Sequence, residues 1–182
     1  MPHYLLFSGH MIDQNGRDPA RFPDSKATAG GEAIYKTLQE AAAGKTDIKG
    51  IAAAASGGDI LFHEACIKLS IPSEIYLGIP IEAFVKTSVA PAGPEWIGRY
   101  RKLIVALPVH ILHPDATESA PSTIWEEANN WMLETALSSG GDHLTLIVLW
   151  DGNKGETGGT AHMVQVANDH RATVEIIDTH TL

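Results

Sequence analysis

The sequence contains a single cysteine, Cys66, among its 182 residues. One cysteine forms neither an intramolecular disulfide nor a cysteine-based metal site, and this favours a reducing compartment. No stretch approaches the roughly eighteen apolar residues that a membrane-spanning helix needs. The segment after Met1 has neither the charged start nor the apolar length of a secretory signal. We therefore expect a cytoplasmic protein that does not contact a membrane.

Basic residues are also scarce, because 13 lysines and arginines stand against 22 acidic residues and give a net charge of −9. A broad nucleic-acid surface would need clustered basic side chains, so we expect none. The glycine-rich motifs of dinucleotide dehydrogenases and P-loop NTPases are absent, and the nine histidines show no HxH or HxxxH spacing. We expect neither a metal ion nor a cofactor. A small phosphorylated ligand remains compatible with the charge.

The overall composition, with 44% apolar and 19% charged residues, is typical of a folded globular protein. A chain of this length forms a sizeable core, and we expect one domain over residues 1–182. Strand-like and helical segments alternate along it, which predicts an α/β fold with a mostly parallel sheet covered on both faces. The predicted strands are 4–7, 48–55, 74–79, 109–112, 144–150 and 173–177, and the predicted helices are 27–42, 58–69, 95–107, about 121–138 and 160–170.

Three of the predicted strands end in turns that are rich in glycine and polar residues. In a parallel sheet such loops meet at one edge and line a shared cleft. Glycine lets backbone amides approach a ligand closely, and a helix N-terminus favours a phosphate. The candidate ligand-binding residues are Ser8, Gly9 and His10 after the first strand, Gly57, Gly58 and Asp59 after the second, and Asp151, Gly158, Gly159 and Thr160 after the fifth.

Two of these candidates, Asp59 and Asp151, have carboxylates that could orient the hydroxyls of a ribose. Asp59 is equally well placed to cap the following helix, and Gly158-Gly159 could be only a tight turn. The first loop runs for about eighteen residues, a length typical of functional or disordered loops. Its Arg17 and Arg21 are candidate partners of a ligand phosphate, with ordinary surface arginines as the alternative.

Glu64 is the candidate catalytic residue. It follows Asp59 on the predicted helix, and a carboxylate facing the cleft could act on the sugar carbon during N-glycosidic cleavage. The alternative is a solvated or capping glutamate. The segment from Phe84 to Pro94 could be a lid over the cleft or a connector.

Four segments together resemble the SLOG superfamily, which includes Lonely-guy-type phosphoribohydrolases and the DNA-processing protein A fold. The segments are 7–13, 21–23, 58–65 and 150–161. The resemblance implies a Rossmann-like three-layer sandwich with five or six strands and a pocket for a nucleotide-like small molecule. It also implies a homodimer or higher homo-oligomer and, for a sensor, an effector protein as a further partner.

The last turn differs from that of the hydrolytic members of the group, whose corresponding turn resembles the motif Pro-Gly-Gly-x-Gly-Thr-x-x-Glu. Here Thr160 is followed by Ala161-His162-Met163, without the glutamate, and nucleoside deoxyribosyltransferases show the same mismatch. The departure favours binding and sensing of a nucleotide-derived ligand. The alternative is an N-glycoside hydrolase or ribosyltransferase that uses Glu64.

Overall fold

The computed structural model describes residues 1–153 and 159–182. In this part of the chain, six strands form one all-parallel sheet in the spatial order β4-β3-β2-β1-β5-β6. The strand order reverses beside β1, because β2, β3 and β4 follow one another on one side of it, whereas β5 and β6 lie on the other side. The strands are β1 (His3–Gly9), β2 (Ile48–Ala52), β3 (Ser73–Leu77), β4 (Val109–Ile111), β5 (Leu144–Trp150) and β6 (Thr173–Asp178).

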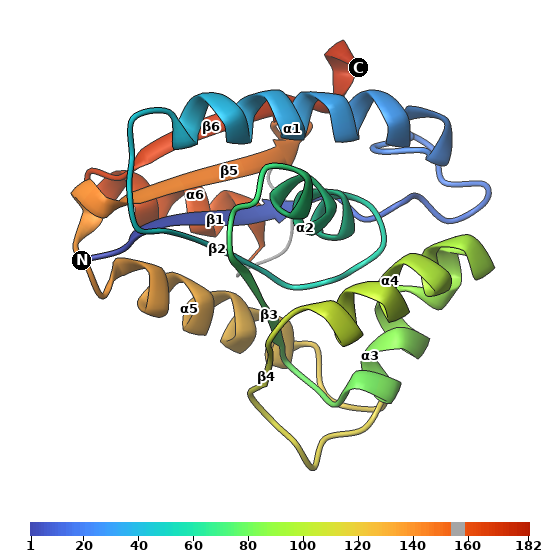
Figure 1. The fold of residues 1–182 in the computed structure, drawn as a ribbon. Coiled ribbons are helices and arrows are strands. Elements are labelled where there is room, and N and C mark those ends of the chain that lie inside the picture. The colour runs from blue at the N-terminus through green and yellow to red at the C-terminus, as the bar shows by residue number, and fades with distance from the viewer. Residues whose placement is uncertain (154–158) are drawn as a thin grey trace.

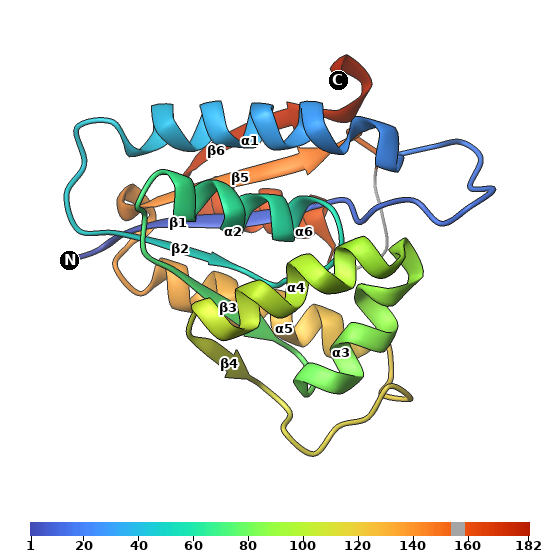
Figure 2. The same ribbon diagram turned by 45° about the vertical axis from the view of Figure 1, so that its right-hand side comes forward.

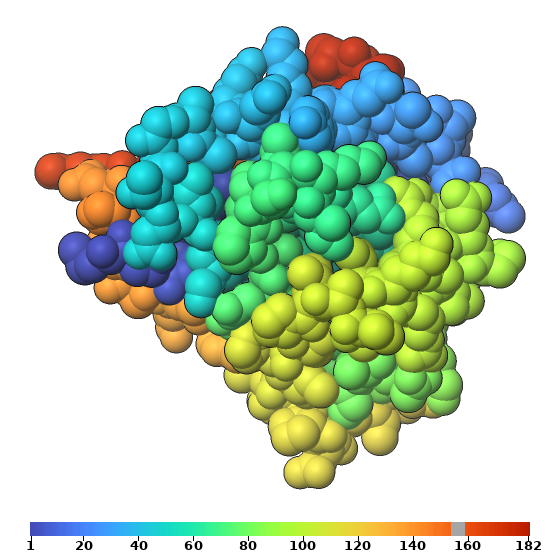
Figure 3. All heavy atoms as spheres, viewed as in Figure 1, coloured from blue at the N-terminus to red at the C-terminus, as the bar shows by residue number. Residues whose placement is uncertain are grey.

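Helices cover both faces of this sheet and complete three layers. Helices α1, α2 and α4 lie on one face and α5 and α6 on the other, with α3 beside α4 (Figures 1 and 2). Figure 3 shows the face that α1, α2 and α4 cover. The helices are α1 (Ala27–Ala42), α2 (Gly58–Lys68), α3 (Ile81–Ser88), α4 (Pro94–Ala106), α5 (Thr123–Leu137) and α6 (Thr160–Asp169). The predicted Rossmann-like α/β architecture is confirmed.

Two apolar cores hold the layers together, one on each face of the sheet. Successive side chains of a strand point to opposite faces, so Leu5 and Phe7 of β1 enter the core under α1 and α2. Tyr4 and Leu6 enter the core under α5 and α6. Because central parallel strands are buried on both faces, β1 and β5 contain continuous apolar runs, at 4–7 and 146–150.

Helix α3 differs from the sequence-based prediction, which left residues 84–94 as a lid or a connector. Ile81–Ser88 forms a helix that begins directly after Pro80, and Phe84 donates its amide to the Pro80 carbonyl. Proline is well suited to this position, because its backbone angle fits the approach to a helix and its missing N–H would have no partner there. Within residues 1–153 and 159–182, no helix is long and apolar enough to cross a membrane.

Candidate functional site

Two adjoining cavities lie where the carboxyl ends of β1, β2 and β5 reach the same edge of the sheet. Both are lined by Gly159 and Thr160, at the start of α6. The first, here called the arginine cavity, measures about 710 Å³, and its lining includes His10, Arg17, Arg21 and Asp151. The second, here called the slot, measures about 430 Å³, and its lining includes Phe7, Ser8, Gly9, Asp59, Phe84 and Trp125. The predicted convergence of the three loops is therefore present.

The start of α6 lies between the two cavities. The Thr160 hydroxyl is 3.0 Å from the hydroxyl of Ser8 at the end of β1. The first amides of a helix have no acceptor within the helix, and they carry partial positive charge. This end of α6 is therefore suited to an anionic group of a ligand. Gly158, the other glycine predicted for this turn, lies outside the described residues.

A carboxylate that sequence analysis did not single out organises the long first loop. Asp13 Oδ2 accepts hydrogen bonds from the backbone amides of Arg21 and Phe22, each at 2.8 Å. Its Oδ1 lies 3.5 Å from Arg17 Nε. Phe22 is fully buried and anchors the loop in the core beneath α1. Asp13 thus folds the loop so that Arg17 and Arg21 line one cavity.

His10 and Asp151 join the β1 loop to the end of β5. His10 Nε2 is 3.2 Å from both Oδ1 and the backbone nitrogen of Asp151. Asp151 also accepts hydrogen bonds from the backbone and side chain of Asn153, at 3.1 and 3.0 Å. Burial raises the pKa of Asp151, but the hydrogen bonds from Asn153 and His10 outweigh it and hold the pKa below its usual value. Both carboxylate oxygens thus help to fix this turn, while Asp151 also lines the arginine cavity, and its contact with a ribose stays a prediction.

The walls of the slot combine aromatic and small apolar residues with polar side chains, and they include one buried carboxyl. Phe84 from α3 and Trp125 from α5 face it, with ring centroids 6.0 Å apart. Asp59 is only 8% exposed, and its Oδ2 accepts a hydrogen bond from the Ala55 amide at 3.2 Å. Burial raises the pKa of Asp59 to about 7, although the Ala55 hydrogen bond acts in the opposite direction. Asp59 therefore closes the turn before α2 rather than capping the helix, and it also lines the cavity.

Gly57 and Gly58 serve a different purpose from the one predicted. The Gly58 amide donates to the His10 carbonyl at 3.1 Å instead of facing a ligand, and Gly57 pairs with Met11. A Cβ on Gly57 would lie 2.8 Å from both the His10 carbonyl oxygen and the Ile12 nitrogen. Neither glycine lines the arginine cavity or the slot. Gly57 allows two loops to pack backbone against backbone, and Gly58 leaves room for the Phe7 ring, which a Cβ there would meet at 2.8 Å. The prediction that both glycines present amides to the ligand is corrected.

We expect Gly57→Ala to lower the free energy of unfolding by about 2–4 kcal/mol, since it combines a positive φ of 98° with the close backbone contacts. Urea denaturation measures this change. Gly44→Ala is the matched control, because Gly44 also has a positive φ but nothing within 4 Å of the place that a methyl group would occupy, so only the smaller conformational cost applies. Equal losses in the two variants would contradict the proposed close packing.

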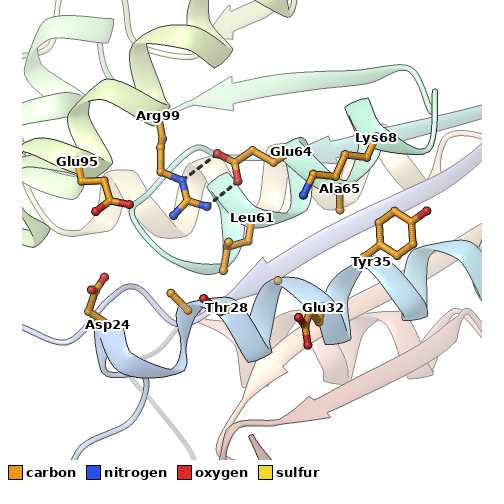
Figure 4. Close-up of a pocket in the computed structure, with 12 residues that line it drawn as sticks. Asp24, Thr28, Glu32, Tyr35, Leu61, Glu64, Ala65, Lys68, Glu95 and Arg99 are labelled. Atoms are coloured by element: carbon orange, nitrogen blue, oxygen red, sulfur yellow. Dashed lines mark hydrogen bonds and ion pairs between the residues drawn. The ribbon is translucent and has the colours of Figure 1, made fainter.

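The prediction that Glu64 faces the cleft is wrong. Figure 4 shows it in a separate hollow of about 640 Å³ between α1, α2 and α4. There Arg99 of α4 donates from Nε and Nη2 to the two Glu64 oxygens, at 2.9 and 2.6 Å. The Arg99 guanidinium also lies 4.2 Å from the ring centre of Trp96, whose indole N–H donates to Asp24 at 2.8 Å. Glu64 therefore links α2 to α4 through an ion pair, in a hollow separate from the arginine cavity and the slot.

The structure thus gathers most, but not all, of the predicted residues. His10, Arg17, Arg21, Asp151, Gly159 and Thr160 line the arginine cavity, and Ser8, Gly9 and Asp59 line the slot with the same Gly159 and Thr160. No group of three or more histidine, cysteine, aspartate or glutamate side chains in the described ranges is arranged to hold a metal ion.

The fold and the cleft define a Rossmann-like α/β protein whose cavities lie at the reversal of strand order. Among solved structures, DNA processing protein A from Streptococcus pneumoniae is similar, with a TM-score of 0.58 and 11% sequence identity. The match covers 95% of this chain and 50% of that chain, so the protein described here spans about half the length of its structural relative. At this identity the similarity concerns the fold. No protein-family model and no curated protein matches the chain.

Proposed function

We propose that this SLOG-like protein binds and senses a nucleotide or a nucleotide-derived small molecule in the two adjoining cavities. The observation that carries the proposal is their arrangement at Gly159 and Thr160: a cavity with two arginines on one side and an aromatic-walled slot on the other. Ligands of doubly wound sheets bind at the reversal of strand order, where these cavities lie.

The arginine cavity suits the phosphate of such a ligand. Guanidinium groups bind phosphate through paired hydrogen bonds, and the N-terminus of α6 adds its partial positive charge. The slot suits the base, because apolar and aromatic walls with a few polar groups are typical of small-molecule sites. Its volume of about 430 Å³ falls in the usual range for such sites.

Binding without turnover is favoured over N-glycosidic cleavage by the position of Glu64. The catalytic alternative needs this carboxylate beside the sugar, whereas its two oxygens are held by Arg99 in another hollow. As a sensor, the protein would respond to the ligand by changing its contact with a second copy or with an effector protein.

The proposal is tested by following the melting temperature and the release of free base together, with millimolar AMP, CMP, IMP and UMP. We expect at least one nucleotide to raise the melting temperature by several degrees and to be recovered intact, since a ligand at 100 times its Kd stabilises by about 2.7 kcal/mol. Glu64→Gln should retain this ligand-induced rise, because Glu64 lies outside both cavities.

Two outcomes would contradict the proposal. Absence of any shift with all four nucleotides would leave the cleft without the proposed ligand class. Base release that Glu64→Gln abolishes would replace the sensor with the hydrolytic alternative.

A further inference from the structure

Charge is divided unequally between the two cavities. The lining of the arginine cavity combines two guanidinium groups with the carboxylates of Asp18 and Asp151. The lining of the slot, as far as the structure describes it, contains Asp59 and Glu118 but no lysine, arginine or histidine. Glu118 lies at the rim, where its half-exposed side chain pairs with Lys86 at 3.1 Å. Asp59 is therefore the carboxyl group that a ligand meets inside the slot.

The hydrogen bonding of Asp59 leaves one oxygen available. Oδ2 accepts from the Ala55 amide, while Oδ1 has no hydrogen-bond partner among the described residues. A buried carboxyl without a nearby cation favours its neutral form, and burial raises the pKa of Asp59 to about 7. The proton of the neutral acid belongs on Oδ1, because Oδ2 is already an acceptor. Asp59 then offers an O–H donor beside a carbonyl acceptor.

We propose that the slot takes a base whose amino group lies beside an unprotonated ring nitrogen, as in adenine and cytosine, and that Asp59 recognises this edge as a neutral acid. The phosphate of the same nucleotide lies in the arginine cavity. This inference rests on the proposed function and specifies the ligand class for the same site.

The chemistry of the base edge explains the choice. The Asp59 O–H donates to the ring nitrogen, and the second lone pair of Oδ2 accepts from the amino group. Deamination to hypoxanthine or uracil replaces the amino group by a carbonyl and places a hydrogen on the ring nitrogen. The Asp59 O–H then faces the N–H of the ring, so that two donors oppose each other, and Oδ2 faces the carbonyl oxygen, so that two acceptors do. A site that forms hydrogen bonds with a polar group of its ligand binds an analogue much more weakly when that analogue leaves the buried groups of the site unpaired.

A pH dependence follows, because recognition needs the protonated acid. The polar groups of the slot that β1, α3, α5 and α6 contribute are Ser8, Thr87, Ser88, Asn129 and Thr160, none of which titrates near neutrality, and the loop before α5 contributes Glu118. On α2 itself, His63 is buried against the Ala53 carbonyl and Ser73. The affinity for AMP should therefore fall as pH rises above 7 and Asp59 ionises.

The test is isothermal titration calorimetry of the intact protein with two matched pairs, AMP with IMP and CMP with UMP, at pH 6.5 and 8.5. We expect the amino-bearing member of each pair to bind at least tenfold more tightly at pH 6.5, and the wild-type affinity for AMP to fall about tenfold at pH 8.5. Asp59→Asn should lose the fall in AMP affinity between pH 6.5 and 8.5, because an asparagine amide presents a donor and an acceptor at both pH values. Phosphate ionisation affects both proteins equally.

The outcomes separate this inference from the proposed function. Equal binding of AMP and IMP, or of CMP and UMP, would overturn the role of Asp59 while leaving nucleotide binding intact. Loss of AMP binding by Asp59→Asn at both pH values, with a single cooperative melting transition no lower in temperature than that of wild type, would do the same. Absence of binding by all four nucleotides would overturn the proposed function and this inference together. The comparison of nucleotide pairs uses wild-type protein, so it does not depend on the folding of a variant.

Discussion

Replacing Arg17 and Arg21 together by glutamine should weaken AMP binding by about a hundredfold, the loss expected when two charge-assisted contacts to a phosphate are removed. Both arginines line the same cavity, beside the partial positive charge at the start of α6. Glutamine keeps much of the side-chain length but removes the charge and the fork of donors that binds phosphate oxygens. Calorimetric titration with AMP measures the change.

The matched control is Lys36→Gln with Lys102→Gln, which removes two positive charges from exposed positions on α1 and α4. We expect that double variant to bind AMP within about threefold of wild type in 150 mM salt, because screening suppresses distant charge effects. A similar loss in both double variants would show that overall charge, rather than contact in the arginine cavity, governs binding.

Asp59→Asn should raise the free energy of unfolding at pH 8.5 by roughly 2–4 kcal/mol in the absence of ligand. Burial raises the pKa of Asp59 to about 7 in the folded protein, above its value near 4 in the unfolded chain. Between these values the folded state binds more protons, so wild-type stability is lost as pH rises through that range. Asparagine has no charge to bury, and its carbonyl can still accept from Ala55.

Urea denaturation from pH 4.5 to 8.5 measures this difference, which should shrink as pH falls. Glu118→Gln is the control. A hydrogen bond from its own backbone amide and a second one from Lys86 hold the pKa of this exposed carboxylate below its usual value, so removing its charge should give no stabilisation at pH 8.5. Burial lowers the pKa of His63 to about 4, so protonation of the unfolded chain destabilises the fold below about pH 6.5. That contribution is the same in wild type and in Asp59→Asn. A constant stability difference across the pH range would contradict the buried-acid account.

Much of the fold could be predicted because its signals are local. The predicted bounds of α1 and β5 agree with the structure, since one carries apolar residues at helical spacing and the other is a continuous apolar run. The short helix α3 escaped prediction, because eight residues between two prolines give few turns over which a period can be recognised. In β2 the predicted strand continued to Ala55, whereas the ladder ends at Ala52 before the chain turns toward Asp59.

The candidate site was predictable where strand direction determined it, and not where tertiary partners did. Parallel strands bring their carboxyl ends to one edge, which placed Ser8, Asp59 and Thr160 together. The spacing of Glu64 on its helix could not reveal that Arg99, 35 residues later, holds it on another side. Likewise, the sequence did not indicate that Asp13 would organise the loop carrying both arginines.

The two cavities draw most of their lining from different parts of the chain. Residues 17–21 contribute to the arginine cavity alone, whereas the side chains from α3 and α5 contribute to the slot alone. On the proposed assignment, an engineer could diversify Phe84, Thr87 and Trp125 to select new bases while leaving residues 17–21 unchanged. In the proposed site, the groups that would select the base and the groups that would anchor the phosphate come from separate segments. A library confined to α3 and α5 would then vary the specificity while every member kept the same phosphate contacts.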